Sequence, residues 1–310
     1  MLFDLDGVIL SERCYWDAAA LTIAYFADRA GITKQVYADV PDIERIDEYG
    51  QVADLRRAFL PDELLYAMRA RSINSNWDRA YAGLMLLLAT MPVDLQTFAP
   101  LALGLLERST NMGQGLLQEL AAMDDVVESM KRLWPGENML QVVTNRFQQY
   151  FLGDPTSLSP IFREGLIQYE TSLDAPERVA AVLQGWKEAD MVLGIGTGRP
   201  RDEALRPLAR LQLLSYFDRA RIRTIDDVMV EEARLGMQKN SLSKPHPFTY
   251  RSASIGYQPQ EVCVIGDSPA DLYAARAAGF QFIGVGQPES FRNDSSYARA
   301  FVPSVLQISL

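Results

Sequence analysis

The hydrophobic pattern divides the chain into two regions. Between residues 11 and 172, apolar residues recur at helical spacing, and runs of β-branched residues are nearly absent apart from the short segment 140–145. Pro61 opens one of the helical segments, and proline favours the first position of a helix. The segments predicted to be helical are 14–31, 61–71, 77–90, 95–109 and 115–134. This region is therefore predicted to be a helical domain.

Strands and helices alternate over the rest of the chain. Apolar runs at 191–197, 261–267 and 282–286 predict strands, and residues 221–225 are a candidate strand. The segments 176–189, 201–213, 248–256 and 269–279 predict helices. Such alternation indicates βαβ units and a parallel sheet. Residues 1–5, which are apolar except for Asp4, predict one more strand of the same kind, separated from the others by the helical region.

These patterns predict an α/β protein with an insertion. Residues 1–10 and 173–310 would form a doubly wound parallel-sheet (Rossmann-like) core, and a large α-helical domain, residues 11–172, would follow its first strand. A chain of 310 residues has the length of one large domain or two ordinary ones.

The net charge and the hydropathy of the chain limit the classes of partner that it is expected to bind. The net charge of −10 argues against binding to nucleic acid, which needs basic residues to replace counterions, and against a polybasic membrane patch. The longest apolar stretch, residues 80–93, is too short to span a bilayer and predicts a buried helix. The chain begins with acidic residues where a signal peptide needs a basic start. We therefore expect a cytoplasmic protein without nucleic-acid or membrane partners.

Several common catalytic and structural sites are excluded by composition. The single histidine, His246, and the two cysteines, Cys14 and Cys263, cannot build a structural zinc site, a cysteine–histidine protease pair or a disulfide framework. A serine triad would have to use His246, and no G-x-S-x-G motif precedes it. His246 lies between two prolines and is predicted to be a local structural or surface residue and not a catalytic one.

Carboxylates follow two of the predicted strands. Asp4 interrupts the first strand, Asp6 follows it, and Asp267 ends the apolar run 261–267. An unpaired buried carboxylate is costly, and Mg²⁺ would supply the partner. Asp271 has an equally good explanation as part of a capping box with Ser268, because Ser268 precedes a predicted helix.

Two further segments carry anion-binding potential. Thr197 and Gly198 lie at the end of the strand 191–197, where a hydroxyl and backbone amides suit a phosphate oxygen. Lys244 precedes Pro245 and Pro247, which are predicted to hold the backbone extended, and its ammonium group is expected to pair with Asp4 and a phosphate oxygen. Thr144 also lies in a candidate strand end, but Thr197 is preferred because it lies closer to Lys244 in the sequence.

Four motifs together resemble the signature motifs of the haloacid dehalogenase (HAD) superfamily. They are DLDGV at 4–8, TGR at 197–199, KPHP at 244–247 and GDSPAD at 266–271, and they occur in the family's order. The helical insertion occupies the position of the C1-type cap in that family, although it is longer than usual and no motif is matched inside it. Arg69, Arg71, Arg79 and Arg146 lie in this insertion. Each of the four is a candidate for contact with an anionic substrate, but most helical arginines are solvated, and none of the four is assigned this role.

The resemblance implies a role for each matching residue. Asp4 would be the nucleophile that accepts a phosphoryl group, and Asp6 the general acid and base, its backbone carbonyl also touching Mg²⁺. Lys244 would neutralise charge on Asp4 and on the phosphate. Thr197 and Gly198 would hold the transferred phosphate. Asp267 would bind Mg²⁺, with Asp271 as a second ligand or next to the ligands.

Asp6 favours phosphate-ester chemistry, because dehalogenases and phosphonate hydrolases of this type lack an aspartate at that position. The first expectation is a magnesium-dependent phosphatase acting on a small phosphorylated metabolite. A sugar phosphomutase similar to β-phosphoglucomutase is the second, since DLDGVI also resembles that branch. The third is a regulatory binding protein that kept the fold without catalysis.

Overall fold

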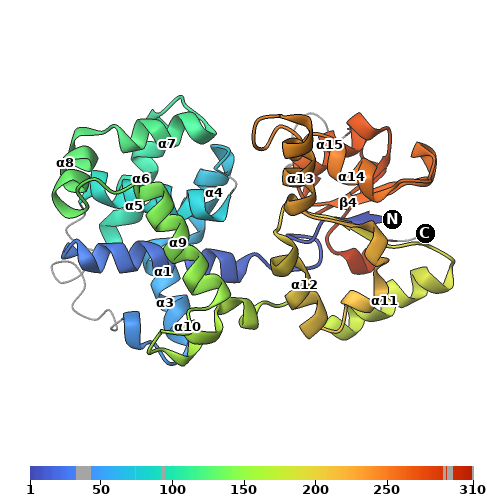
Figure 1. Cartoon of the computed structure of the whole chain (residues 1–310), viewed down its shortest axis with the longest axis horizontal. Coiled ribbons are helices and arrows are strands. Elements are labelled where there is room, and N and C mark those ends of the chain that lie inside the picture. Colours follow the sequence, from blue (N-terminus) through green and yellow to red (C-terminus); the bar gives the residue numbers. More distant parts are fainter. Residues whose placement is uncertain (33–42, 74, 92–94, 289–290, 292–295, 309–310) are drawn as a thin grey trace. The chain divides into compact units, whose positions relative to one another are not determined.

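The computed structural model describes residues 1–32, 43–73, 75–91, 95–288, 291 and 296–308 (Figure 1). Contacts divide the chain into two compact units. Met1–Glu12 together with Glu170–Leu310 form one, here called the α/β unit, and Arg13–Tyr169 form the other, here called the helical unit. The chain thus leaves the α/β unit once, after its first strand, and returns to it once.

The α/β unit is built on a sheet in which every pair of neighbouring strands is parallel. In its described residues the sheet has six strands in the order β3-β2-β1-β4-β5-β6. Their bounds are Leu2–Phe3 for β1, Gly194–Gly196 for β2, Ile222–Arg223 for β3, Cys263–Gly266 for β4, Gln281–Val285 for β5 and Ala300–Val302 for β6. The doubly wound α/β fold is therefore confirmed, with β1 between β2 and β4, where the strand order changes direction.

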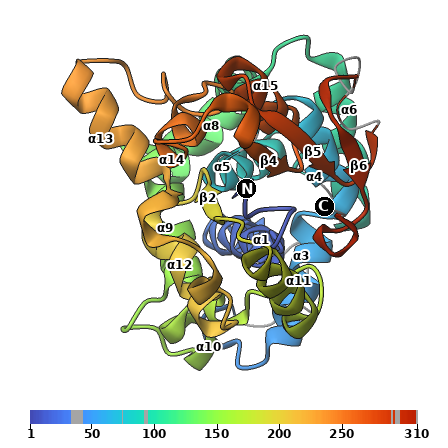
Figure 2. The same ribbon diagram turned by 90° about the vertical axis from the view of Figure 1, so that its right-hand side faces the viewer.

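Helices cover both faces of this sheet (Figure 2). Their bounds are Pro176–Glu188 for α11, Arg201–Arg210 for α12, Ile225–Leu235 for α13, Phe248–Ala253 for α14 and Pro269–Ala278 for α15. Successive strand residues point to opposite faces. Phe3 accordingly packs in a core with α11 and α12, whereas Leu2 packs in another with α14 and α15. Both faces of β1 are buried, as its apolar residues predict.

The helical unit is arranged around α1 (Arg13–Arg29), which packs against α3 (Tyr49–Phe59), α5 (Asn76–Thr90) and α9 (Met139–Leu152). The other α-helices among its described residues are α4 (Asp62–Ala70), α6 (Leu95–Arg108), α7 (Gly113–Ala121), α8 (Asp124–Leu133) and α10 (Pro160–Glu164). The apolar stretch 80–93 is a buried helix as far as α5 extends, and its residues Pro92 and Val93 lie outside the described residues. No described helix is both long enough and apolar enough to cross a membrane.

The sequence-based elements need correction in several places. Residues 140–145 are not a strand but part of α9, because Met139, Val143 and Phe147 recur at helical spacing and are all buried. The predicted helix 115–134 is broken at Met123, whose extended backbone precedes the two aspartates in the first turn of α8. Pro61 is the residue before α4 rather than its first residue. Helices α3, α10 and α13 and strand β6 were not predicted.

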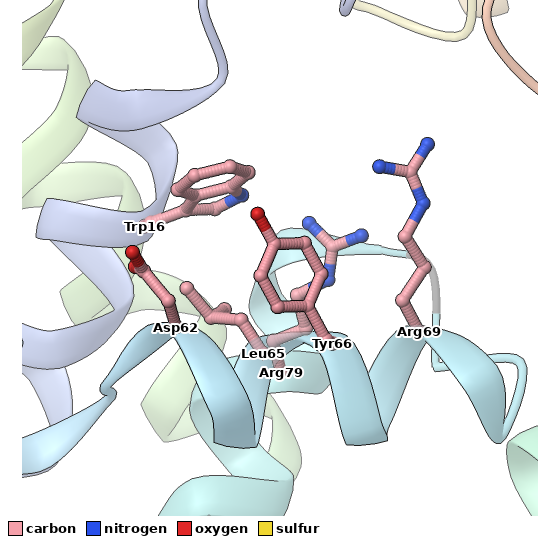
Figure 3. A pocket seen from close by; sticks show the side chains of 6 residues that line it. All are labelled: Trp16, Asp62, Leu65, Tyr66, Arg69 and Arg79. Atoms are coloured by element: carbon pink, nitrogen blue, oxygen red, sulfur yellow. The ribbon is translucent and has the colours of Figure 1, made fainter. Parts of the chain in front are cut away.

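The helical unit carries a pocket of its own (Figure 3). Trp16 on α1 faces residues of α4 and α5, and the lining residues are Trp16, Asp62, Leu65, Tyr66, Arg69 and Arg79. Arg79 is buried and donates to Ile73 O and Asn76 Oδ1, so it is part of the packing of this unit. Of the other arginines in the insertion, Arg71 donates to Ser109 O and Arg146 to Tyr25 Oη.

Candidate active site

Carboxylates gather where β1 and β4 end. Asp4 directly follows β1, Asp267 directly follows β4, and Asp271 lies in the first turn of α15. One oxygen from each of these three carboxylates lies within 4.8 Å of the others. The sequence predicted that strand ends would bring Asp4 and Asp267 together, and the parallel register of β1 and β4 explains why these two meet.

A glycine allows the loop after β1 to approach Asp267. Gly7 has a φ of +69°, which favours glycine, and a Cβ atom placed there would lie 2.1 Å from Asp267 Oδ2. Gly266 plays a similar part for Asp271, because its own Cβ would lie 2.4 Å from Asp271 Cβ. The glycines of the DLDGV and GDSPAD motifs therefore make room for the carboxylates.

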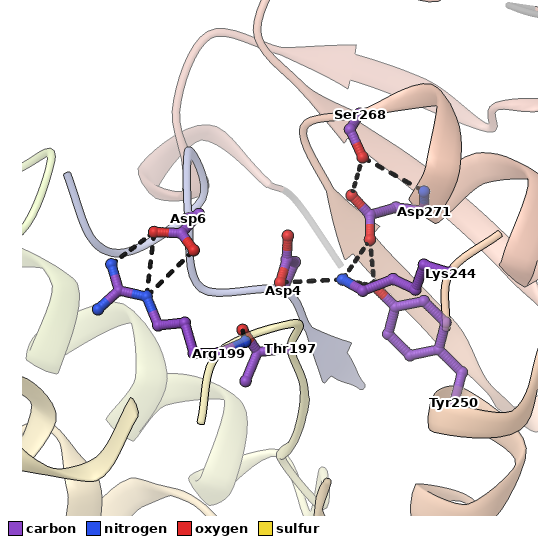
Figure 4. Close-up of polar contacts among 8 residues, drawn as sticks. All are labelled: Asp4, Asp6, Thr197, Arg199, Lys244, Tyr250, Ser268 and Asp271. Carbon is purple, nitrogen blue, oxygen red and sulfur yellow. Dashed lines mark hydrogen bonds and ion pairs between the residues drawn. The ribbon is translucent and has the colours of Figure 1, made fainter. Parts of the chain in front are cut away.

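Lys244 joins two of the carboxylates (Figure 4). Its Nζ lies 3.0 Å from Asp4 Oδ1 and 2.6 Å from Asp271 Oδ1. Asp271 also accepts hydrogen bonds from Tyr250 Oη at 2.7 Å and from Ser268 Oγ at 2.5 Å. The carboxylate of Asp271 is thus surrounded by donors and holds Lys244 beside Asp4.

The electrostatic setting of Asp4 differs from that of Asp271. Burial raises the pKa of Asp4 well above its usual value; Lys244 opposes this shift, and the nearby carboxylates of Asp271, Asp6 and Asp267 reinforce it. Burial also acts to raise the pKa of Asp271, but Lys244 and the hydrogen bonds from Ser268 and Tyr250 outweigh it, so the pKa of Asp271 is lowered. The negative charge of Asp4 is therefore less well compensated than that of Asp271.

Asp4 and Asp267 fit a hard divalent cation. Carboxylate oxygens are the ligands that Mg²⁺ takes from proteins, usually one or two at a time. Burial raises the pKa of Asp4 and the neighbouring carboxylates add to this shift, and a bound cation would offset the negative charge that they share. Asp271 fits a direct ligand less well, because Lys244, Tyr250 and Ser268 already occupy its oxygens. The carboxylate of Asp6 faces Arg199 and not the other carboxylates (Figure 4). The contact between the backbone carbonyl of Asp6 and Mg²⁺ stays a prediction.

Asp6 belongs to a second group of charged residues in the α/β unit. Both of its carboxylate oxygens lie 3.1 Å from Arg199 Nε, and Arg199 also contacts Glu170. Burial raises the pKa of Glu170 to about 7 against the opposing effect of Arg199. Arg199 stands in the TGR motif but was assigned no role from the sequence. Glu170 and Tyr250 were missed, because no local signal marks either residue.

Thr197 lies directly after β2, beside β1, and is buried. Its Oγ1 accepts a hydrogen bond from Arg199 N at 3.2 Å, and its own N–H donates to Arg223 O at 3.0 Å. Gly198 follows it and is exposed. Thr144, by contrast, lies inside α9 and its Oγ1 donates to Leu140 O, so it is not at the end of a strand and the alternative based on it is wrong.

The segment around Lys244 is a turn and not the extended segment predicted from its prolines. His246 N donates to Ser243 O at 2.9 Å, which closes the turn. The ring of His246 accepts a hydrogen bond from Phe248 N at 3.2 Å and is exposed. Its place in the turn and its exposure agree with the local structural or surface position expected for it.

Comparison with known proteins identifies the family. The family model of haloacid dehalogenase-like hydrolases matches residues 1–279, which is most of the chain. The chain belongs to the haloacid dehalogenase-like hydrolases. The resemblance of the four motifs and the expectation of a hydrolase are thereby confirmed.

Individual relatives of this hydrolase are distant. Phosphoglycolate phosphatase of Haemophilus influenzae (strain 86-028NP) is 26% identical over 151 residues, or 48% of this chain and 55% of the relative. This match thus spans about half the length of the curated relative. An X-ray structure of a Northeast Structural Genomics Consortium target is 24% identical with a TM-score of 0.75, covering 98% of this chain and 95% of that one. Phosphatase Tt82 of Thermococcus thioreducens is 19% identical with a TM-score of 0.53, covering 92% of each chain. Both of these solved structures have the same fold as this chain.

Proposed function

We propose that this hydrolase is a magnesium-dependent phosphatase that acts on a small phosphate monoester through an aspartyl-phosphate at Asp4. One observation carries the proposal: a buried carboxylate, Asp4, lies 3.0 Å from the ammonium group of Lys244 in a cluster with Asp267 and Asp271. Phosphoryl transfer depends on positioning and on neutralising charge, and this cluster combines a nucleophile with residues suited to both.

The first step forms the covalent intermediate. An oxygen of the Asp4 carboxylate attacks phosphorus, and the bond between phosphorus and the ester oxygen breaks with its electron pair on that oxygen. Asp6 gives its proton to the departing oxygen, so that the alcohol leaves neutral. Lys244 stays beside Asp4 and offsets the negative charge of the phosphoryl oxygens. Thr197 supplies a hydroxyl at the end of β2 that is suited to one of those oxygens, and the backbone N–H of Gly198 is assigned to the same phosphate.

The second step restores the enzyme. Asp6, now ionised, takes a proton from water while the water oxygen attacks phosphorus. The bond between phosphorus and Asp4 breaks, its electron pair returns to the carboxylate, and inorganic phosphate leaves. Asp267, with Asp4 and the backbone carbonyl of Asp6, would hold Mg²⁺, which when bound supplies positive charge next to the reacting phosphate. Asp271 is assigned the task of holding Lys244 rather than that of a direct ligand.

The two units receive separate tasks in this proposal. The α/β unit is the catalytic core, since it contains all the residues named above. The helical unit, Arg13–Tyr169, is the cap, whose limits were predicted from the sequence at residues 11 and 172. Substrate choice is assigned to the helical unit, and a small phosphorylated metabolite is the partner proposed for the site. Phosphoglycolate belongs among the candidates because a curated relative is a phosphoglycolate phosphatase.

The test is a panel of phosphate monoesters that includes phosphoglycolate, hexose phosphates and nucleoside monophosphates. Purified protein is assayed for phosphate release with MgCl₂ and again with excess EDTA. Release with MgCl₂ that EDTA abolishes is the expected result. Interconversion of hexose phosphates without release would support a sugar phosphomutase instead, and no reaction with any ester would favour a non-catalytic binding protein.

A further inference from the structure

Arg199 connects two carboxylates that are far apart in the sequence. Its Nη2 lies 2.5 Å from Asp6 Oδ1, and its Nε lies 3.1 Å from each oxygen of the same carboxylate. On its other edge, Nη1 donates to Glu170 Oε2 at 3.1 Å, and Nη2 lies 2.8 Å from Glu170 Oε1. One planar guanidinium therefore holds two carboxylates, each by more than one contact.

The three residues differ in burial. The side chain of Arg199 is 2% exposed and that of Glu170 is 0% exposed, whereas that of Asp6 is 27% exposed. Arg199 Nη1 also donates to Glu203 O at 3.2 Å. The guanidinium is thus fixed from the inside of the unit by Glu170 and Glu203, and the carboxylate that it presents toward solvent is that of Asp6.

The main chain around this group is fixed as well. Arg199 N donates to Thr197 Oγ1, and Arg199 O accepts from Ile225 N at 3.1 Å. Glu170 begins the return of the chain to the α/β unit, and its carbonyl oxygen accepts a hydrogen bond from Arg210. The main chains of Arg199 and Glu170 are thus both held by hydrogen bonds. Asp6 is therefore the member that is positioned by the other two.

We propose that Arg199, held by Glu170, is the positioning residue that orients the carboxylate of Asp6 for proton transfer. This inference rests on the proposed function, in which Asp6 is the acid and base. A proton-transfer group has to lie within hydrogen-bond reach of the reacting oxygen, and a carboxylate that turns freely spends little time there. A guanidinium fixes both oxygens of a carboxylate in one plane, which a lysine ammonium group does not.

The test compares two substrates that differ in their need for a proton. The alcohol of an alkyl phosphate leaves only when protonated, whereas 4-nitrophenolate is stable enough to leave unprotonated. The ratio of kcat/KM for the two substrates, measured with MgCl₂, therefore reports on the proton donor. Asp6→Asn is the reference and should lose about 10²–10⁴-fold with the alkyl phosphate and far less with 4-nitrophenyl phosphate.

Arg199→Ala should show the same selectivity as Asp6→Asn, with a loss of about 10–100-fold on the alkyl phosphate, since it disorders the donor without removing it. In the double variant Asp6→Asn/Arg199→Ala, the ratio should equal that of Asp6→Asn alone, because two residues that act through one group are not additive. Arg206→Ala is the matched control. Arg206 lies on the same helix as Asp202, its ion-pair partner, and is 46% exposed, so its removal should leave the ratio unchanged.

Two results would overturn the proposal while leaving the proposed function in place. One is an equal loss on both substrates in Arg199→Ala, which would indicate a structural or phosphate-binding role. The other is a loss in the double variant equal to the product of the single losses. If the wild-type protein releases phosphate from neither ester, the proposed function fails, and the role of Arg199 fails with it.

A second variant covers the case in which Arg199→Ala does not fold, since that change leaves Glu170 buried without its cation. Arg199→Lys keeps the positive charge but cannot hold both carboxylates in the same plane. It should hydrolyse 4-nitrophenyl phosphate within a few-fold of wild type and lose at least tenfold on the alkyl phosphate, in keeping with a displaced proton donor. A wild-type ratio in this variant would refute positioning by the guanidinium.

Discussion

Two buried aspartates, one in each unit, have opposite surroundings. Asp4 in the α/β unit is 7% exposed and Asp17 on α1 of the helical unit is 0% exposed. Asp17 accepts a hydrogen bond from Tyr49 Oη at 2.5 Å and lies 3.3 Å from Arg56 Nε. Asp4 has the ammonium group of Lys244 on one side and the carboxylates of Asp271, Asp6 and Asp267 near it.

The difference distinguishes a structural carboxylate from a reactive one. Burial raises the pKa of both, but Tyr49, Arg56 and Arg13 act to lower the pKa of Asp17. Around Asp4, three other acids add to the effect of burial. The donors around Asp17 offset only part of the effect of burial, so the pKa of Asp17 stays raised, whereas the like charges around Asp4 add to that effect and call for a further cation. Burial alone therefore does not tell a structural carboxylate from a reactive one.

The largest expected effect comes from replacing each aspartate with asparagine. Asp4→Asn removes the proposed nucleophile and should lower phosphate release by about 10⁴-fold or more. It also removes a carboxylate from a crowded cluster, so without MgCl₂ its free energy of unfolding should equal or exceed that of wild type. Phosphate detection and urea unfolding measure the two effects.

Asp17→Asn is the matched change in the helical unit. It should keep turnover within a few-fold of wild type and lower the free energy of unfolding by about 1–3 kcal/mol, because Arg56 and Tyr49 lose a charged partner. The comparison would be broken if Asp17→Asn abolished phosphate release, or if Asp4→Asn left it near the wild-type rate.

Glu170 provides the next largest effect, because it is a buried carboxylate with Arg199 as its cation. Its pKa in the folded protein is raised from 4.5 to about 7, so the folded state holds a proton that the unfolded state has released between these values. Wild-type stability from this group is therefore present below about pH 4.5 and is lost as the pH rises through about 7. The glutamine of the Glu170→Gln variant cannot ionise, so the variant should not lose stability from this position as the pH rises.

The measurement is urea unfolding of Glu170→Gln and wild type across this range. The stability of the variant relative to wild type should rise with pH by up to about 3 kcal/mol, because a difference of one between the folded and unfolded pKa corresponds to about 1.4 kcal/mol. A relative stability that is constant or falls with pH would show that Arg199 keeps Glu170 ionised in the folded protein.

The stabilisation of the protein by Mg²⁺ should depend on Asp267 in the α/β unit and not on Asp17 in the helical unit. At a concentration a hundredfold above its Kd, an ion that binds only the folded protein raises the free energy of unfolding by about 2.7 kcal/mol. Asp267→Asn should lose this gain and Asp17→Asn should keep it. Thermal unfolding with MgCl₂ and with EDTA gives the difference, and an undiminished gain in Asp267→Asn would place the ion elsewhere.

The smallest effects come from two tyrosines that donate to buried carboxylates. Tyr250→Phe removes the hydrogen bond to Asp271, and Tyr49→Phe removes the one to Asp17. Each should lower the free energy of unfolding by about 1 kcal/mol. Only Tyr250→Phe should also slow phosphate release, since Asp271 holds Lys244. Equal rates of phosphate release in the two variants would contradict the claim that only the tyrosine in the α/β unit supports catalysis.

The strand ends were accessible from the sequence, because apolar runs interrupted by Asp4, Asp267 or Thr197 are a local signal. The partners of these residues were not. Glu170 and Tyr250 reach the site through tertiary contacts, and neither stands in a motif. The segment 140–145 misled because its β-branched residues favour a strand locally, while burial of Val143 and Phe147 on one face of α9 decides for a helix.

Trapping the phosphoryl group tests the central claim most directly. The wild-type protein is mixed with a hydrolysed ester and MgCl₂, quenched in acid, digested and analysed by mass spectrometry, with Asp4→Asn treated in parallel. The account predicts one added phosphoryl group on Asp4 in the wild-type protein and none in the variant. A phosphoryl group on any other residue, or turnover in the Asp4→Asn protein, would contradict it.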